Sequence, residues 1–335
     1  MYSHIINEIK SNLTDDKEYN KVYLMHQAEK YSNNEYAYEI IKEISRLLIM
    51  NMTPEERRNL TQNAQEQNQI IQILNEVMPY IQSNNLRKAM EIMDSRMPNY
   101  VPMIVDDRVS EYHYFANPIE QVLFEETIGC SKELIVLNAE ESDFDLYYIY
   151  GFLLMEFNRL SEAKHALIKC LKLNPVSTRV NFEFGEIYKK EGNFEKFYEL
   201  TNNALNYSFS SLDLARAYRN LGFYYIEMNE LELATALFNY SLVYEANMTA
   251  YSELEYIKSL GYDKKMDVDY SVELIKNNNI QMGVNPLIFS IIQELIKIFT
   301  RTQNYNQLLN MYEISFDLTH NQDFLNKINE LKRMM

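Results

Sequence analysis

The chain is poor in the residues that turn or interrupt a backbone. Its 335 residues include only 7 glycines and 7 prolines, where average usage would give about 23 and 17. Strand-rich folds need many turn residues, so this scarcity excludes an all-β protein and disfavours a glycine-rich nucleotide-binding fold. Because 47% of the residues are hydrophobic and 24% are charged, the chain is globular rather than disordered. The composition therefore predicts an all-α protein.

Positive charge is also scarce. The sequence has 32 Lys and Arg against 48 Asp and Glu, which gives a net charge of −16. Phosphate backbones and anionic lipid surfaces are bound mainly through Lys and Arg, so we expect no nucleic-acid partner and no membrane partner. The two cysteines, Cys130 and Cys170, lack the spacing of a metal or redox site, which predicts free thiols in a reducing compartment.

Long apolar runs and targeting signals are missing as well. The longest apolar stretch, residues 287–299, contains Gln293, Glu294 and Lys297, and it is too short and too polar to cross a bilayer. The first residues carry neither the basic nor the apolar region of a signal peptide. These features predict a cytoplasmic protein, and the richness in Asn, Ile and Tyr is typical of an AT-rich, bacterial genome.

The segment before residue 144 divides into a helical and an irregular part. Apolar residues at a period of 3.6 predict several helices in residues 1–98, one of them with Val22, Met25, Ala28 and Tyr31 on its inner face. Another helix is predicted to begin at Pro54 and to be broken or kinked by Pro79. Residues 99–143 are less regular, with a predicted helix over 118–127 and a short extended piece over 134–137.

A repeating pattern begins at residue 144. Gly151, Gly185 and Gly222 follow one another at intervals of 34 and 37 residues, which implies an insertion of about three residues near Ser208. Each glycine precedes a predicted turn and a second helix. Two antiparallel helices approach closely only where side chains are small, so these glycines predict the contact within each helix pair.

These segments resemble the tetratricopeptide repeat, a helix–turn–helix of about 34 residues. Asn158, Gly192 and Asn229 stand in the turns, Ala163 and Ala234 on the second helices, and Pro175 closes the first copy. Phe197 departs from the small residue that the family pattern has there. The resemblance covers three copies in 144–247, is weaker over 289–320 and is faint over 84–97.

The resemblance implies a helical-hairpin solenoid, wound as a right-handed superhelix, with an additional helical N-terminal region. The predicted segments are 1–98 (helical N-terminal region), 99–143 (irregular connection), 144–247 (three repeats) and 248–335 (C-terminal helices with a degenerate repeat).

In this family the first helices line a concave groove that binds peptides or protein segments. The resemblance therefore implies candidate ligand-binding residues, which are Tyr148, Phe152, Arg179, Phe182, Lys189, Arg216, Arg219, Asn220 and Phe223. Arg binds carboxylates with two parallel hydrogen bonds, and aromatic walls add cation–π contacts, so the predicted ligand is an acidic segment or a C-terminal carboxylate. The alternative is that the groove cations, Lys190 included, pair with neighbouring acids such as Glu183 and Glu186.

The sequence contains no GxGxxG motif, no Walker A loop, no HExxH and no CxxC. We therefore predict no enzyme activity, no catalytic residue, no metal and no cofactor. His113, with Asp106 and Asp107 nearby, is the one histidine for which a metal or acid–base role is conceivable. The predicted function is that of a cytoplasmic adaptor that binds a peptide or protein segment.

Two alternative functions stay open. One is a bacterial signalling-peptide receptor or regulator whose sensor domain is the repeat array. The other is a self-assembling structural protein, which would form a homodimer through an apolar face of the C-terminal helices. That predicted face consists of Leu287, Ile291, Leu295 and Ile298.

Overall fold

The computed structural model describes residues 2–14, 16–32, 34, 36–53, 69–100, 110–139 and 142–334. The chain divides into two compact units, Met1–Gln72 and Ile73–Met335. This division separates only two units, so the predicted segment boundaries at residues 98, 143 and 247 stay predictions. The helix start predicted at Pro54 lies outside the described residues. Within those residues, none of the helices combines the length and the apolar character that a bilayer crossing requires.

Among the described residues up to Thr53, the first unit has the helices α1 (Ser3–Ser11), α2 (Lys17–Lys30) and α3 (Ala37–Asn51). Their apolar faces share one small core, formed mainly by Ile9, Leu24, Ile40 and Ile44. Asp16 begins α2 because its carboxylate accepts hydrogen bonds from the backbone of Glu18 and Tyr19, which satisfies two free N–H groups of the first turn.

Helix α2 turns inward only part of the face that the periodicity predicted. Ala28 and Tyr31 pack against this core, but Val22 and Met25 are 70% and 63% exposed, whereas Asn20 and Leu24 are buried. The Asn20 amide bonds the backbone of Thr14 at 2.9 and 2.7 Å. A buried polar side chain is tolerated when its hydrogen bonds are made. Asn20 can therefore lie on the inner face of α2, although apolar periodicity counts only hydrophobic residues as inward-facing.

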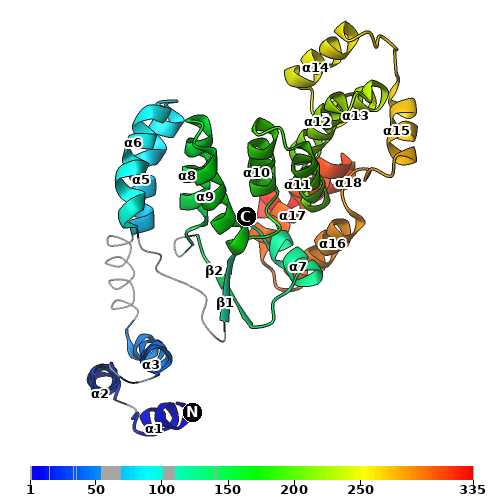
Figure 1. Cartoon of the computed structure of the whole chain (residues 1–335). Helices are drawn as coiled ribbons and strands as arrows, with labels where there is room; N and C mark the ends of the chain where they lie inside the picture. The colour runs from blue at the N-terminus through cyan, green and yellow to red at the C-terminus, as the bar shows by residue number, and fades with distance from the viewer. Residues whose placement is uncertain are drawn as a thin grey trace. The chain divides into compact units, whose positions relative to one another are not determined.

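Five pairs of helices in the second unit share one type of three-residue connection. The pairs are α5 (Gln69–Gln82) with α6 (Leu86–Arg96), α8 (Phe144–Glu156) with α9 (Leu160–Leu173), α10 (Thr178–Lys190) with α11 (Phe194–Tyr207), α12 (Ser211–Glu227) with α13 (Leu231–Tyr244), and α16 (Pro286–Arg301) with α17 (Tyr305–Thr319). Figure 1 shows α8 to α13 following one another as consecutive pairs. The predicted helix pairs over 144–247 are confirmed, and so is the weaker pair over 289–320.

The middle residue of each connection has a left-handed backbone. These residues are Asn84, Asn158, Gly192, Asn229 and Gln303, with φ between 55° and 71°. Glycine adopts this conformation without strain and Asn with less strain than most residues. The Asn and Gly turns that the sequence predicted therefore end the first helix of each pair.

The repeat glycines lie where the two helices of a pair meet. A Cβ atom on Gly222 would lie 2.7 Å from the Phe238 ring, and one on Gly151 would lie 2.9 Å from Leu167. Gly185 has more room, since its nearest neighbour, Phe197, would be 3.5 Å away. The predicted close approach is confirmed in all three pairs, with Phe197 filling the space that opens at Gly185.

Helix lengths explain two irregularities of the pattern. The inserted residues lengthen α12, which has 17 residues where α10 has 13. Helix α5 continues for three residues beyond Pro79, so the predicted break is wrong. A proline so close to a helix end removes only one backbone hydrogen bond from the remaining turn.

A small sheet interrupts the array between α6 and α8. After η1 (Met97–Asn99), strand β1 (Ser110–Tyr114) pairs in parallel with β2 (Glu133–Leu137), and α7 (Pro118–Thr127) connects them. The helix over 118–127 and the extended piece over 134–137 are confirmed. Strand β1 was not predicted, because a single five-residue strand gives little periodic signal.

The C-terminal part contains α14 (Met248–Ser259), α15 (Val268–Asn277) and α18 (Gln322–Met334) besides the α16–α17 pair. Helix α7 packs against α16, as Figure 1 also shows. Ile291 and Leu295 are therefore only 5% exposed, and they share a core with Leu123 of α7. The prediction that this C-terminal face is exposed was wrong, because α7 covers it; of its residues only Ile298 is largely exposed, at 42%.

Candidate functional site

Ion pairs link the first helices of the three repeats. Arg179 of α10 pairs with Asp145 of α8 at 2.5 Å, and Arg216 of α12 pairs with Glu183 of α10 at 3.1 Å. In both pairs the partners stand close to one repeat length apart in the sequence. Each arginine thus connects its own repeat to the preceding one.

Both arginines also lie over an aromatic ring of the preceding first helix. The guanidinium carbon of Arg179 is 4.6 Å from the centre of the Tyr148 ring, and that of Arg216 is 4.5 Å from the centre of the Phe182 ring. Tyr148 and Phe182 occupy the same position in consecutive repeats. An ion pair and a cation–π contact therefore occur together twice, and they hold the three first helices in one register.

The two groove lysines of α10 also have partners within the protein. Lys189 lies 3.8 Å from the centre of the Phe223 ring and 3.9 Å from the Glu186 carboxylate. Lys190 donates a hydrogen bond of 3.3 Å to the backbone carbonyl of Met155. These contacts reach from α10 to α12 in one direction and to α8 in the other.

The fifth cation of the predicted groove, Arg219, is the least exposed. It donates a hydrogen bond of 2.7 Å to Glu245, which follows α13, and its side chain is 14% exposed. All five predicted groove cations are therefore neutralised or hydrogen-bonded inside the protein. Pairing with Glu183 and Glu186, which the sequence allowed as an alternative, is what the structure shows.

Seven of the nine candidate binding residues are partly exposed, and two are buried. Phe182 is 1% exposed and packs between α10 and α12, and Asn220 is 8% exposed. The side-chain nitrogen of Asn220 has no hydrogen-bond partner in the described part of the chain. The partly exposed aromatic residues, Tyr148, Phe152 and Phe223, come from the first and third of the three first helices.

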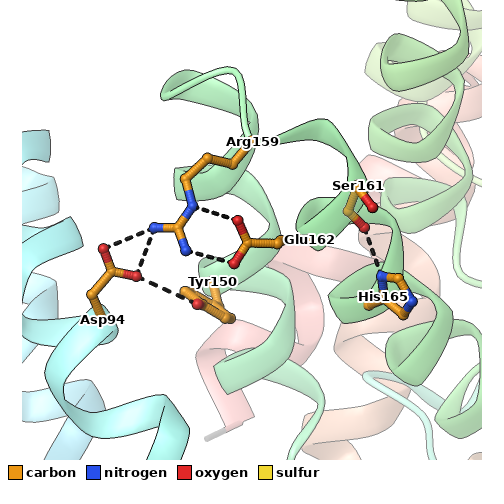
Figure 2. A network of polar contacts seen from close by, with 6 residues as sticks. All are labelled: Asp94, Tyr150, Arg159, Ser161, Glu162 and His165. Atoms are coloured by element: carbon orange, nitrogen blue, oxygen red, sulfur yellow. Dashed lines mark hydrogen bonds and ion pairs between the residues drawn. The ribbon is translucent and has the colours of Figure 1, made fainter.

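A second polar network joins the α5–α6 pair to the first repeat. Figure 2 shows Arg159, at the start of α9, between the carboxylates of Asp94 and Glu162. Its guanidinium bonds both oxygens of Asp94 at 2.7 and 2.8 Å and both oxygens of Glu162 at 2.7 and 2.5 Å. The parallel Nε and Nη2 bonds to Glu162 form a bidentate pair, which lowers the pKa of Glu162, whereas Nη1 alone bonds both oxygens of Asp94.

A cavity of about 330 Å³ lies beside this network, between η1 and the α8–α9 pair. Its polar groups bond one another: Lys169 donates to the Tyr147 hydroxyl at 2.9 Å, and His165 Nδ1 lies 2.7 Å from the Ser161 carbonyl (Figure 2). Tyr100 donates a hydrogen bond to the buried carboxylate of Asp143. These tyrosine, lysine and carboxylate groups therefore satisfy one another within the protein, and they connect the segment after η1 to the α8–α9 pair.

His113 belongs to the core. It is 6% exposed, its ring stacks on Phe115 and lies 4.5 Å from Phe124, and Nδ1 is 3.2 Å from the Leu173 carbonyl. Asp106 and Asp107 lie outside the described residues. Throughout the described ranges, no three His, Cys, Asp or Glu side chains form a group that could hold a metal ion. Both cysteines are free thiols, Cys170 fully buried.

Sequence reasoning placed the five cations on the first helices but did not identify the groups with which they pair. Asp145 and Glu245 were not considered as partners, although Asp145 precedes Arg179 by one repeat length. A search for opposite charges one repeat length apart would have found the Asp145–Arg179 pair. Glu245 follows a helix end, so no fixed repeat interval points to it.

No family model matches the chain, and no curated protein matches it. Among solved structures it is similar to the crystal structure of the P58(IPK) TPR domain, with 10% sequence identity and a TM-score of 0.31 over 95% of this chain and 93% of that chain. Backbones that superpose so loosely carry no argument, so the description of the repeats rests on their own geometry. On the evidence of their helix pairs, turns and glycine contacts, α8 to α13 form three TPR-like helical hairpins.

Proposed function

We propose that the chain is a non-catalytic, cytoplasmic interaction protein that binds a peptide or protein segment along α8, α10 and α12. The observation that supports this proposal is the register of the three first helices, which ion pairs and ring contacts lock into one continuous face. A preformed face loses little conformational entropy on binding. The partly exposed rings of Tyr148, Phe152 and Phe223 supply apolar area on it.

The pairing of the groove cations bears on the chemistry of the ligand. A carboxylate that bound Arg179 or Arg216 would have to displace Asp145 or Glu183 from contacts already made. The gain from such an exchange is small, because one charge-assisted hydrogen bond replaces another. We therefore propose that apolar side chains and backbone groups of the ligand supply most of the affinity, and the acidic or C-terminal specificity stays a prediction without support.

The experiment is a selection of random peptides on the purified full-length chain, followed by binding measurements with Phe152→Glu. Phe152 is a partly exposed candidate on α8 that takes part in none of the cation contacts described above. We expect selected peptides to bind Phe152→Glu at least tenfold more weakly, since a charge would enter an apolar contact.

The matched control is Ile168→Glu in the same helix pair. Ile168 is 53% exposed on α9, and its replacement should leave peptide affinity unchanged. Peptides that tolerate Phe152→Glu but lose affinity for Ile168→Glu would place the binding surface on the second helices and overturn the proposal.

The separate N-terminal unit favours a second candidate function. Residues Met1–Gln72 form a compact unit with its own core, which is the organisation expected of a signalling-peptide receptor with an attached effector. In that case, a selected peptide bound to the array should change amide hydrogen exchange in α1, α2 or α3. Exchange rates in these helices that are identical with and without peptide would argue against the second candidate.

A further inference from the structure

A pocket of about 380 Å³ lies between α13, α14 and the segment that connects α14 to α15. Leu254 of α14 and Met266 of the connecting segment supply apolar surface. Three lysines also line it: Lys258, Lys264 and Lys265. The pocket belongs to neither the face of α8, α10 and α12 nor the cavity beside Arg159.

Two of the three lysines are held in place by acids. Lys264 lies 2.7 Å from the Glu232 carboxylate, and Lys258 lies 2.5 Å from that of Glu255. Glu255 is the single acid among the residues that line the pocket, while Asp263 is close enough to Lys258 to raise its pKa further. The three lysines therefore face three acids, Glu255 in the lining and Glu232 and Asp263 beside it, and Lys265 is the lysine of the pocket that has no ion pair in the described part of the chain.

Three polar groups of the pocket have no partner among the described residues. Lys265 forms no ion pair there, and the side chains of Asn239 and Tyr251 form no hydrogen bond. The Tyr262 hydroxyl is buried and faces the Glu232 carboxylate without a hydrogen bond of good geometry. Burial and the nearby Glu232 carboxylate raise the pKa of Tyr262 to about 12, so the hydroxyl remains a donor at neutral pH.

A buried donor whose hydrogen bond is poorly made costs free energy that a suitable ligand can recover. Lysine ammonium groups bind phosphate as point charges, and hydroxyl and amide donors fix its orientation. Small-molecule sites combine apolar walls with a few convergent polar groups, usually in pockets of about 300 Å³ or more. The α13–α14 pocket has each of these features.

We propose that the α13–α14 pocket binds a small phosphate-bearing molecule. Lys265 and the Tyr262 hydroxyl bind the phosphate oxygens, and Tyr251 with Leu254 contacts the rest of the molecule. This binding site is independent of the peptide-binding function proposed for the first helices.

The test is calorimetric titration of the full-length protein with inorganic pyrophosphate at low ionic strength. We expect one saturable site per chain that weakens as salt is added, because salt screens the lysines. Lys265→Gln and Tyr262→Phe should each weaken binding about tenfold or more, the effect of losing one hydrogen bond to a charged group. Both replacements keep the size of the side chain nearly unchanged, and circular dichroism with thermal unfolding verifies that the variants fold.

The matched control is Lys297→Gln, since Lys297 of α16 pairs with Glu294 at 2.6 Å outside the pocket. Its affinity for pyrophosphate should equal that of the wild type. Absence of saturable binding, or equal loss in Lys265→Gln and Lys297→Gln, would overturn the proposal. So would tighter binding of citrate than of pyrophosphate, because the site would then prefer carboxylates.

Discussion

The face of α8, α10 and α12 and the α13–α14 pocket contain the same types of side chain, but they differ in how completely these side chains are paired within the protein. On the first-helix face, every predicted groove cation pairs with an acid, a ring or a carbonyl, and most of these contacts join consecutive repeats. In the pocket, Lys265, the Tyr251 hydroxyl and the Asn239 amide have no partner among the described residues. Both regions carry lysine or arginine beside aromatic rings.

This difference separates structural charges from charges that are free for a ligand. A cation that bridges two helices stabilises the array, and its removal leaves a partly buried acid unpaired. A cation without a partner contributes little to stability, and its removal changes binding instead. Residue type and position in a repeat do not distinguish the two cases.

The largest expected effect comes from breaking one inter-repeat bridge. Arg216→Ala removes the partner of Glu183, whose side chain is 13% exposed, and the cation over Phe182. We expect a loss of about 2 kcal/mol in the free energy of unfolding, because a nearly buried carboxylate is left without its hydrogen bond. Urea denaturation followed by circular dichroism measures the difference.

Lys265→Ala provides the contrast for that measurement. Lys265 has no ion pair in the described part of the chain, so its loss should change the free energy of unfolding by less than about 0.5 kcal/mol. Equal destabilisation by Arg216→Ala and Lys265→Ala would remove the distinction between the two regions.

A pair of glycine substitutions tests the packing beneath the first-helix face. Gly222→Ala places a Cβ 2.7 Å from the Phe238 ring, whereas Gly185→Ala meets Phe197 at 3.5 Å. We expect Gly222→Ala to destabilise the protein by about 1–2 kcal/mol through overpacking. Gly185→Ala should be neutral or stabilise by up to about 1 kcal/mol, since alanine favours a helix over glycine. Thermal unfolding of both variants measures these two changes in stability. A larger loss in Gly185→Ala than in Gly222→Ala would contradict the helix contacts at these glycines.

Glu120 is a buried carboxyl whose charged form is disfavoured by the fold, in contrast to the paired and the unpaired cations. Burial raises the pKa of Glu120, which is 7% exposed and accepts hydrogen bonds from Ala116 N at 2.7 Å and from Asn174 at 3.0 Å; the positive charge of Arg179 opposes the rise. The folded state therefore holds this proton to a higher pH than the unfolded chain, and the associated stability is lost as the pH rises through the raised pKa.

Glu120→Gln should accordingly have a pH-dependent effect. Near pH 4 the variant and the wild type should be similarly stable, whereas near pH 8 the variant should be more stable by about 1 kcal/mol, because a neutral amide oxygen accepts the same two hydrogen bonds. Urea titrations at both pH values measure this difference. A variant that loses stability only at pH 8 would show that the charged form of Glu120 is favoured by the fold.

The smallest expected effect concerns the ligand of the first-helix face. If all cations of this face are paired within the protein, amidation of the C-terminal carboxylate of a selected peptide should change Kd by no more than about twofold. Fluorescence anisotropy with the free-acid and amidated peptides measures the ratio. A tenfold loss on amidation would restore the carboxylate specificity and show that the ligand displaces the internal acids.

Much of the array was predictable from its residues. Gly151, Gly185 and Gly222, together with the Asn and Gly turns, located three helix pairs to within a few residues, because close helix packing and left-handed turns each admit few residue types. The inner face of α2 was not predictable from apolar periodicity, since Asn20 is buried by hydrogen bonds to Thr14 and not by its own hydrophobicity.

The candidate site was likewise predictable only in part. Repeat spacing placed Tyr148, Phe152, Arg179, Arg216 and Phe223 on the first helices, where the structure has them. It did not reveal that Phe182 is buried, nor that α7 covers Ile291 and Leu295. These outcomes depend on segments far apart in the chain, and no local pattern records which of them meet.

Helical class, helix pairs and turns follow from local requirements: few turn residues, small side chains at intervals near one repeat length, and residues that tolerate a positive φ. The pairing of Arg219 with Glu245, the cover over α16 and the unpaired groups of the α13–α14 pocket follow from tertiary packing alone. Charges interact through space, and at about 4 Å the energy depends on burial as much as on sign. A charged residue therefore acquires its role only when the fold supplies or withholds its partner.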